Sequence, residues 1–401
     1  MAAVAVHETV RLKADTTDRF GLTWQPALAA GILANLDRID VVEIIAEEQF
    51  AASSRAARAL ETLAHQVPLL VHGVALGPAS TASVDARRLD RLARLVDRVE
   101  PAFWSEHLAS VRAADIEIGH LAAAPRTKAT IDATASNLAR AASVVGSRPM
   151  VENIATLMEP PASDCSEVEW VSSVVAGSDC DLLLDLHNVH ANSVNFGFDP
   201  IAYLDRLDPE RIGAIHLAGG SWIEGPDGPL EGGRHVERRY LDDHLHDVPD
   251  PVYALLAEVG ARVRRPLTVV LERDGRFPPM RDLLWQLDRA RAALAEGRAR
   301  AGANSSTMSI EHSALSLDRS MRPEFETLLA RLYTEAPLRA RFLANPRAEA
   351  ERHQLNAEEC DALERIDRVG LEMSARSFAH KRAITGARRR LFPRFPFLRR
   401  G

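Results

Sequence analysis

Cysteine is scarce in this sequence, and its scarcity limits what can hold the fold together. The 401 residues include three cysteines, Cys165, Cys180 and Cys360, an odd number with no CxxC spacing. Disulfide frameworks and cysteine-based structural zinc sites need paired or closely spaced cysteines. We therefore expect reduced thiols, no structural zinc on cysteine, and a cytoplasmic protein.

Long apolar runs and an excess of basic charge are also missing. No apolar run approaches the roughly 20 residues that span a bilayer. The opening MAAVAVHETVRLKADTTDRF lacks the basic start and long apolar core of a signal peptide. The formal net charge is −7, which gives no reason to expect binding to a polyanion. The sequence therefore predicts that neither a membrane nor a nucleic acid is its partner.

What the sequence does have is a series of short apolar runs that end in a metal-binding side chain. The seven runs are too short for helices, are rich in Val, Ile and Leu, and are typical of buried strands in a parallel sheet. They are VVEIIAE, PLLVH, AFWSEH, PMVE, DLLLD, IGAIH and LTVVLE, and end in order at Glu47, His72, His107, Glu152, Asp185, His216 and Glu272. Packing alone does not explain such a series, so we expect the strand ends to converge on a polynuclear metal centre.

Segments with helical periodicity lie between these runs. Apolar residues recur at three- and four-residue steps, as on helices that cover a sheet, in residues 51–66, 86–99, 128–145 and 278–297. A further strand at about residues 20–25 brings the number of strands to eight. Eight β/α units predict an α/β fold of the TIM type, a (β/α)8 barrel with its active site at the carboxyl ends of the strands. An open doubly wound sheet is the alternative, but it would spread the strand ends along a line.

Two long connections add candidates at the active-site end. Residues 186–200 and 218–250 are longer than a covering helix requires, and we expect loops that bind or cover substrate. Asn188 in the first lies three residues after the strand-end Asp185, and Asp242 and His244 in the second are two apart, so each pair could reach one ion.

The chain changes character near residue 298. Residues 299–320 are small and polar, as in a linker, whereas the following text is helical and carries no catalytic constellation. We therefore expect a barrel followed by a small all-α C-terminal domain. The predicted division is an N-terminal extension at 1–19, the barrel at 20–298, a linker at 299–320, a helical accessory domain at 321–390 and a basic tail at 391–401.

Imidazole and carboxylate side chains together suit first-row transition metals, and mixed sites with open positions are characteristic of non-haem iron. A single strand-end histidine is more often structural, so the metal prediction depends on the whole set of strand-end residues.

Taken together, the motifs show a specific family resemblance. In order, the segments HGVALG, PAFWSEHLA, VENIATLM, CDLLLDLHNVHANSVNFGFDP, IHLAGG, LDDHLHDVPDPVY and LERDGRFPP resemble the multinuclear non-haem iron-dependent oxidative enzymes, over residues 20–295.

The resemblance implies a TIM barrel that holds two or three iron ions and uses dioxygen as co-substrate. The implied partner is a ribosomally made precursor peptide, oxidised at a cysteine or another residue, with or without a separate recognition protein. Carried over by position, the implied metal ligands are His72, His107, Glu152, Asp185, Asn188, His216, Asp242, His244 and Glu272. The text IIAEEQF departs from the family, because Ile45 and Glu48 stand where members commonly have histidine and asparagine.

The C-terminal region, LYTEAPLRARFLANPRAEAERHQLNAEECDAL, resembles small helical domains that accompany peptide-modifying enzymes. It therefore predicts either a peptide-binding module or a bundle that stabilises the barrel or a homodimer. Two other functions also stay open for the whole chain. One is a divalent-metal isomerase or endonuclease on the same barrel, although a nuclease would need a basic groove. The other is a non-catalytic protein that stores or senses metal.

Overall fold

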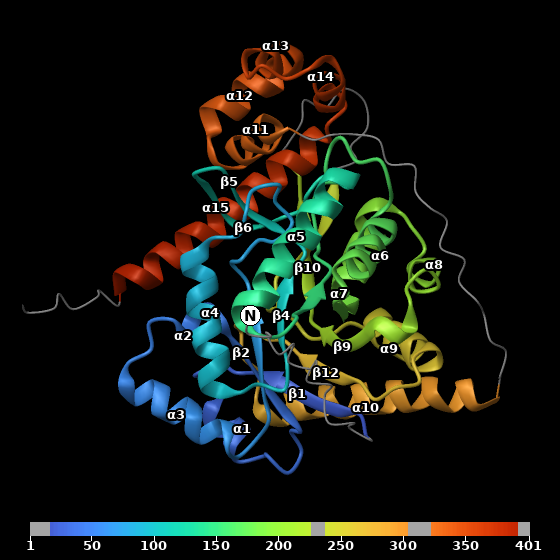
Figure 1. Ribbon diagram of the computed structural model, residues 1–401. Helices are drawn as coiled ribbons and strands as arrows, with labels where there is room; N and C mark the ends of the chain where they lie inside the picture. Colours follow the sequence, from blue (N-terminus) through green and yellow to red (C-terminus); the bar gives the residue numbers. More distant parts are fainter. Residues whose placement is uncertain (1–16, 226–236, 304–321, 392–401) are drawn as a thin grey trace, which may run out of the picture.

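Eight parallel strands form a closed barrel in the computed structural model, which describes residues 17–225, 237–303 and 322–391 (Figure 1). Around the barrel the strands follow the order β1, β12, β9, β8, β7, β4, β3, β2, and β2 pairs with β1 to close it. The barrel strands are β1 (Arg19–Thr23), β2 (Val41–Ile45), β3 (Leu69–Gly73), β4 (Trp104–His107), β7 (Met150–Glu152), β8 (Asp181–Asp185), β9 (Ile212–Leu217) and β12 (Thr268–Leu271). The predicted TIM-type barrel is therefore confirmed, and the open sheet is excluded.

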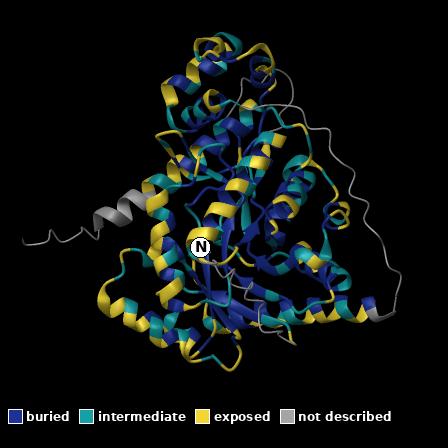
Figure 2. Cartoon of the chain, viewed as in Figure 1, coloured by how far each residue is buried: buried dark blue, intermediate teal, exposed yellow. Residues whose placement is uncertain are grey.

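Burial explains why these short runs become strands. Strands β2, β3 and β8 consist almost entirely of buried residues, because the barrel interior covers one face and the surrounding helices cover the other (Figure 2). The prediction that the run VVEIIAE is a strand that ends at Glu47 is wrong. Strand β2 stops at Ile45, and Glu47 lies in the short helix α2 (Ala46–Gln49).

Helices follow most of the strands and cover the outside of the barrel. The four helices expected from periodicity are present as α3 (Ser54–Ala64), α4 (Ala86–Val99), α5 (Lys128–Val145) and α10 (Met280–Ala303). The remaining covering helices are α1 (Ala29–Leu33), α6 (Glu167–Ser178), α7 (Leu186–Phe196), α8 (Pro200–Leu204), the 3-10 turn Pro209–Arg211 and α9 (Asp250–Arg262). In the described part of the chain, no helix is both long and apolar enough to cross a membrane.

The predicted loop at 186–200 is instead mostly helix. Helix α7 begins directly after β8, because the Asp185 carboxylate accepts a hydrogen bond from the Asn188 amide and caps the helix. The second predicted loop, 218–250, contains an antiparallel hairpin of β10 (Gly220–Glu224) and β11 (Arg238–Asp242). Its central part, 226–236, lies outside the described residues.

A second antiparallel hairpin, β5 (Ser110–Ala113) with β6 (Ile116–Ala122), follows β4 and supports the C-terminal helices. These helices form an apolar cluster of their own, which also takes in Ala113, Ile118 and Ala122 of the hairpin and Met158. Figure 1 shows α11 to α14 gathered beyond one end of the barrel, and α15 running past the hairpin. The five helices are α11 (Pro323–Thr334), α12 (Ala336–Ala344), α13 (Pro346–Arg352), α14 (Ala357–Glu364) and α15 (Arg368–Leu391).

The expected linker begins later than predicted, because α10 continues through residues 299–303. Most of the predicted extension at 1–19, most of the linker at 299–320 and nearly all of the tail at 391–401 lie outside the described residues.

Candidate metal centre

The carboxyl ends of six barrel strands bring predicted ligands together. Two groups have ligand atoms within 4.8 Å of one another, and every member is buried. The first group is His72, His107 and Glu152, and the second is Glu152, Asp185, His216 and Glu272. Glu152 is common to both groups, so the structure outlines two adjoining sites rather than one.

Glu152 ends β7, and its carboxylate lies among three imidazoles. Its Oε2 atom is 3.3 Å from Nε2 of His72 and 3.3 Å from Nε2 of His107. Its Oε1 atom is 3.2 Å from Nδ1 of His216. Because each oxygen faces a different group of nitrogens, this carboxylate has the geometry of a bridging ligand.

The Nδ1 atoms of His72 and His107 each contact a group on the neighbouring strand. His72 Nδ1 lies 2.8 Å from the Ser105 hydroxyl, and His107 Nδ1 lies 3.2 Å from the Gly73 carbonyl. The remaining ring nitrogen of each histidine therefore faces Glu152. Outer partners of this kind fix the tautomer and orientation of a ligating imidazole.

Asp185 and Asn188 are hydrogen-bonded to each other at the start of α7. Asp185 Oδ1 accepts the Asn188 amide at 2.7 Å, and the Asn188 side-chain amide donates to the Asn153 carbonyl at 3.0 Å. This leaves Asp185 Oδ2 and Asn188 Oδ1 buried without a hydrogen-bond partner among the described residues. Both predicted residues therefore keep one oxygen available, although a helix rather than a loop presents them.

Asp242 and His244 lie next to each other at the edge of the ligand cluster. Asp242 Oδ1 lies 2.9 Å from His187 Nδ1 and 2.9 Å from His244 Nε2. The other nitrogen of His244 is 3.8 Å from Glu272 and 3.4 Å from Asp274. His244 has a positive φ of 55°, an uncommon backbone conformation for a residue other than glycine. The pair is therefore connected to the buried groups through Glu272.

Glu47 is not part of the ligand cluster. Its carboxylate accepts the backbone amides of Val74 and Ala75 at 2.9 to 3.2 Å and so holds the segment that follows His72. Burial raises the pKa of Glu47 to about 7. Of the two residues that depart from the family text, Ile45 pairs in register with His72 on β3, and Glu48 is exposed.

Sequence reasoning missed one buried acid in the cluster. Glu43, in the middle of β2, places Oε2 3.0 Å from Nε2 of His216. The available signal was a carboxylate inside an otherwise apolar strand, VVEII. Ser105 and Asn153 were also missed, although each lies within a predicted motif, SEH or VEN, next to or near its ligand.

Burial and neighbouring charges shift the pKa values of the acids and histidines in the cluster. Burial, reinforced by the negative charge of Glu152, raises the pKa of Asp185 well above 3.8. Burial opposes the charged form of His216, yet Glu272, Glu43 and Glu152 together raise its pKa well above 6.5. Burial, and then the charge of His107, lowers the pKa of His72 to about 3, which leaves a neutral imidazole suited to ligation.

The donor set fits first-row transition metals. It combines imidazole nitrogen with carboxylate oxygen, and buried Glu152 Oε2, Asp185 Oδ2 and Asn188 Oδ1 have no hydrogen-bond partner within the described residues. Buried polar atoms without partners are costly, so these three oxygens are candidates for binding a metal ion.

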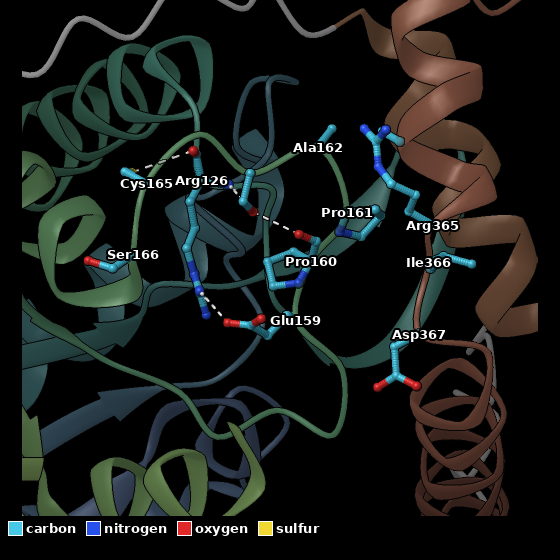
Figure 3. A pocket seen from close by; sticks show the side chains of 12 residues that line it. Arg126, Glu159, Pro160, Pro161, Ala162, Cys165, Ser166, Arg365, Ile366 and Asp367 are labelled. Carbon is cyan, nitrogen blue, oxygen red and sulfur yellow. Dashed lines mark hydrogen bonds and ion pairs between the residues drawn. The ribbon is translucent and has the colours of Figure 1, made fainter. Parts of the chain in front are cut away.

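A cavity of about 480 Å³ lies beside the centre's face of the barrel, between the segment after β7 and the α14–α15 junction (Figure 3). Arg126, a buried residue, lines its barrel side and reaches Glu159 at 3.4 Å. Arg365 and Asp367 line it from the helical side. Asp367 is bonded to Arg239, whereas the side chain of Arg365 makes no hydrogen bond or ion pair to any described residue.

Comparisons with known proteins agree with this architecture. A family model described as "RiPP precursor modification enzyme MbnB/TglH/ChrH" matches residues 19–295. A UPF0276 protein of Anaeromyxobacter sp. (strain Fw109-5) is 34% identical over 252 residues, 63% of this chain and 84% of the relative. A UPF0276 protein of Caulobacter vibrioides (strain NA1000 / CB15N) is 31% identical over 282 residues, 70% of this chain and 96% of the relative.

Among solved structures, D-psicose 3-epimerase from Clostridium cellulolyticum H10 has a TM-score of 0.44 and 14% identity, over 71% of this chain and 99% of the epimerase. At this TM-score and identity, the likeness does not indicate the chemistry of this chain.

Proposed function

The chain belongs to the MbnB/TglH/ChrH family of RiPP precursor modification enzymes, and from this premise we propose that it is a multinuclear non-haem iron enzyme. In this proposal it uses dioxygen to oxidise a cysteine in a ribosomally made peptide. The observation that carries the proposal is the position of Glu152, whose two oxygens face two different sets of buried histidines. A carboxylate in that position supports a centre with more than one ion.

The ligands divide between two adjoining sites that share Glu152. His72 and His107 complete one site, and Asp185, His216 and Glu272 complete the other. Asn188, buried beside Asp185, and the pair Asp242 and His244 are available as further ligands, in agreement with the implied count of two or three ions. Iron at these positions would supply redox chemistry towards dioxygen, which zinc cannot supply.

The test of the reaction is co-expression with the short peptide encoded beside the gene. We expect an oxygen-dependent change in the mass of the peptide, located on a cysteine by fragmentation. A peptide whose cysteines are replaced by serine is the matched control and should keep its mass. A reaction that proceeds anaerobically with manganese or zinc would contradict the proposal and favour the isomerase or endonuclease alternative. Stable iron loading without dioxygen consumption in the presence of the peptide would favour storage or sensing.

We further propose that the precursor peptide is bound at the cavity between the barrel and the C-terminal helices. Arg365 supports this, because it lines the cavity and its guanidinium group makes no hydrogen bond or ion pair to the described residues. A guanidinium group pairs well with a carboxylate, so the bound segment should carry an acidic side chain.

The variant Arg365→Glu tests this placement, since it reverses a charge that contributes to no described contact. Arg368→Glu is the matched control, because Arg368 is also exposed but does not line the cavity. We expect R365E to weaken peptide binding at least tenfold in calorimetry while R368E leaves it unchanged. Equal affinities for the two variants would place the peptide elsewhere.

A further inference from the structure

Glu43 occupies a position where a barrel normally has an apolar side chain. It lies in the middle of β2, is 0% exposed and has fully buried Val42 and Ile44 as neighbours. The interior of a (β/α)8 barrel is usually filled by branched apolar residues. Because an unpaired buried carboxylate is strongly destabilising, this one requires a specific partner.

That partner is His216. Glu43 Oε2 lies 3.0 Å from Nε2 of His216, and Glu43 Oε1 accepts the Thr23 hydroxyl at 3.5 Å. Thr23 and Glu43 are paired in register on β1 and β2, so backbone pairing fixes the height of the carboxylate in the barrel. Glu43 is therefore held from one side and contacts the imidazole on the other.

The second nitrogen of His216 faces the opposite way. Its Nδ1 atom lies 3.2 Å from Glu152 Oε1 and 3.2 Å from Glu272 Oε2, two members of the second ligand group. An imidazole nitrogen that ligates a metal carries no hydrogen, so the hydrogen of the neutral ring must then be on Nε2. An Nε2–H buried in the barrel needs an acceptor, and Glu43 is placed to be that acceptor.

We infer that Glu43 is a positioning residue for the metal centre. It accepts the Nε2 hydrogen of His216 and holds the ring so that Nδ1 faces the site shared with Glu152 and Glu272. The inference rests on the proposed metal centre and adds a residue that the family resemblance did not imply. Glu43 is not itself a ligand, because it belongs to neither group of converging ligand atoms and lies across the ring from them.

Two substitutions separate positioning from ligation. Glu43→Met keeps a side chain of similar length but removes the acceptor. Glu43→Gln keeps an acceptor oxygen and removes the charge that a ligand would provide. Leu70→Ala is the control for disturbed packing, since Leu70 is also 0% exposed inside the barrel. Purified full-length protein is loaded anaerobically with ⁵⁷Fe(II), and the bound iron is measured by elemental analysis and Mössbauer spectroscopy.

We expect E43M to lower the affinity for one iron about 10- to 100-fold, as is typical for the loss of an outer-sphere partner of a metal ligand. Its Mössbauer spectrum should lose or shift one quadrupole doublet. E43Q and L70A should retain the iron content and the doublets of the wild type. If E43M does not fold, E43Q alone decides the question, because an altered E43Q spectrum would overturn the inference.

The failure of this inference is distinguishable from that of the proposed function. Wild-type protein that binds no iron under these conditions would remove the metal centre itself. Wild-type protein with its full complement of iron, together with a folded E43M variant of the same content and spectrum, would remove only the role of Glu43.

Discussion

Single residues decided how far the site could be predicted from the sequence. Strand-end histidines and acids stand out because each terminates an apolar run, and the structure brings six of the nine expected ligands into two overlapping groups. Glu43 could not be found in this way, because its partner His216 is far along the chain and meets it only when the barrel closes. Glu47 was misplaced because an apolar run does not show where a strand becomes a helix.

Asp185 offers a residue-scale prediction, because its two oxygens have separate tasks. Oδ1 caps α7, while Oδ2 is buried without a hydrogen-bond partner in the described part of the chain. Asparagine caps helices as well as aspartate does, so Asp185→Asn should keep the fold but lose at least half of the bound iron. Elemental analysis and thermal unfolding measure the two effects.

Asp199→Asn is the matched control, since Asp199 caps α8 in an exposed position away from the ligand groups. It should leave both iron content and thermal stability unchanged. If D185N kept the full iron content of D199N, Asp185 would not be a ligand.

At the scale of elements, hydrophobic periodicity located the helices between strands but not the helix that follows β8 directly. The segment 186–200 resembled a loop because it is rich in His, Asn and Phe rather than in strong helix formers. An aspartate at the strand end supplies the cap, and that local hydrogen bond determines where α7 starts. The same carboxylate serves as a helix cap and a candidate ligand, a double role that spacing alone does not reveal.

The capping box of α6 gives an element-scale prediction with a defined pH dependence. The Ser166 hydroxyl oxygen accepts a hydrogen bond from the Glu169 backbone amide, and the Glu169 carboxylate accepts one from the Ser166 backbone amide. The hydrogen bond that the Ser166 hydroxyl donates to the Glu169 carboxylate is the main cause that lowers the pKa of Glu169 from 4.5 to about 2. A carboxyl with a lowered pKa stabilises the fold above its ordinary pKa, and the contribution is lost as the pH falls from 4.5 towards 2.

Ser166→Ala should therefore cost about 1 kcal/mol of unfolding free energy at pH 7. Ser172→Ala, farther along the same helix, should cost much less. Glu169→Gln should be destabilising at pH 7 and nearly neutral at pH 2.5, as measured by urea unfolding at both values. A penalty for E169Q that did not shrink at low pH would refute this account of the cap.

At the scale of the whole molecule, the sequence predicted a barrel and a helical region but not how they meet. The C-terminal region contacts segments that follow four different barrel strands, and Met158 after β7 belongs to the shared apolar cluster. Glu326 of α11 binds residues after β3, the apolar cluster takes in the hairpin after β4, and Asp367 bonds Arg239 of the hairpin after β9. All of these segments leave carboxyl ends of strands, so the helices lie on the active-site side. Such contacts between distant segments leave no periodic trace in the sequence.

Glu326 gives the prediction at this scale. Its buried carboxylate accepts the Ser80 hydroxyl at 3.0 Å, the Thr81 amide at 2.8 Å and the Thr81 hydroxyl at 2.9 Å. Glu326→Ala leaves these buried or partly buried donors without this acceptor and should lower the unfolding free energy by about 1–3 kcal/mol. Glu324→Ala, on the exposed face of α11, should change it by less than about 0.5 kcal/mol. Equal effects in urea unfolding would show that the two parts do not depend on this contact.

The most direct test of the central claim is the number of iron ions per chain. Protein purified and loaded anaerobically should contain more than one iron per chain by elemental analysis. Glu152→Gln should lose iron from both sites, because both ligand groups share this carboxylate. A wild-type content of one iron or fewer, or zinc alone in freshly prepared active protein, would contradict the multinuclear iron centre.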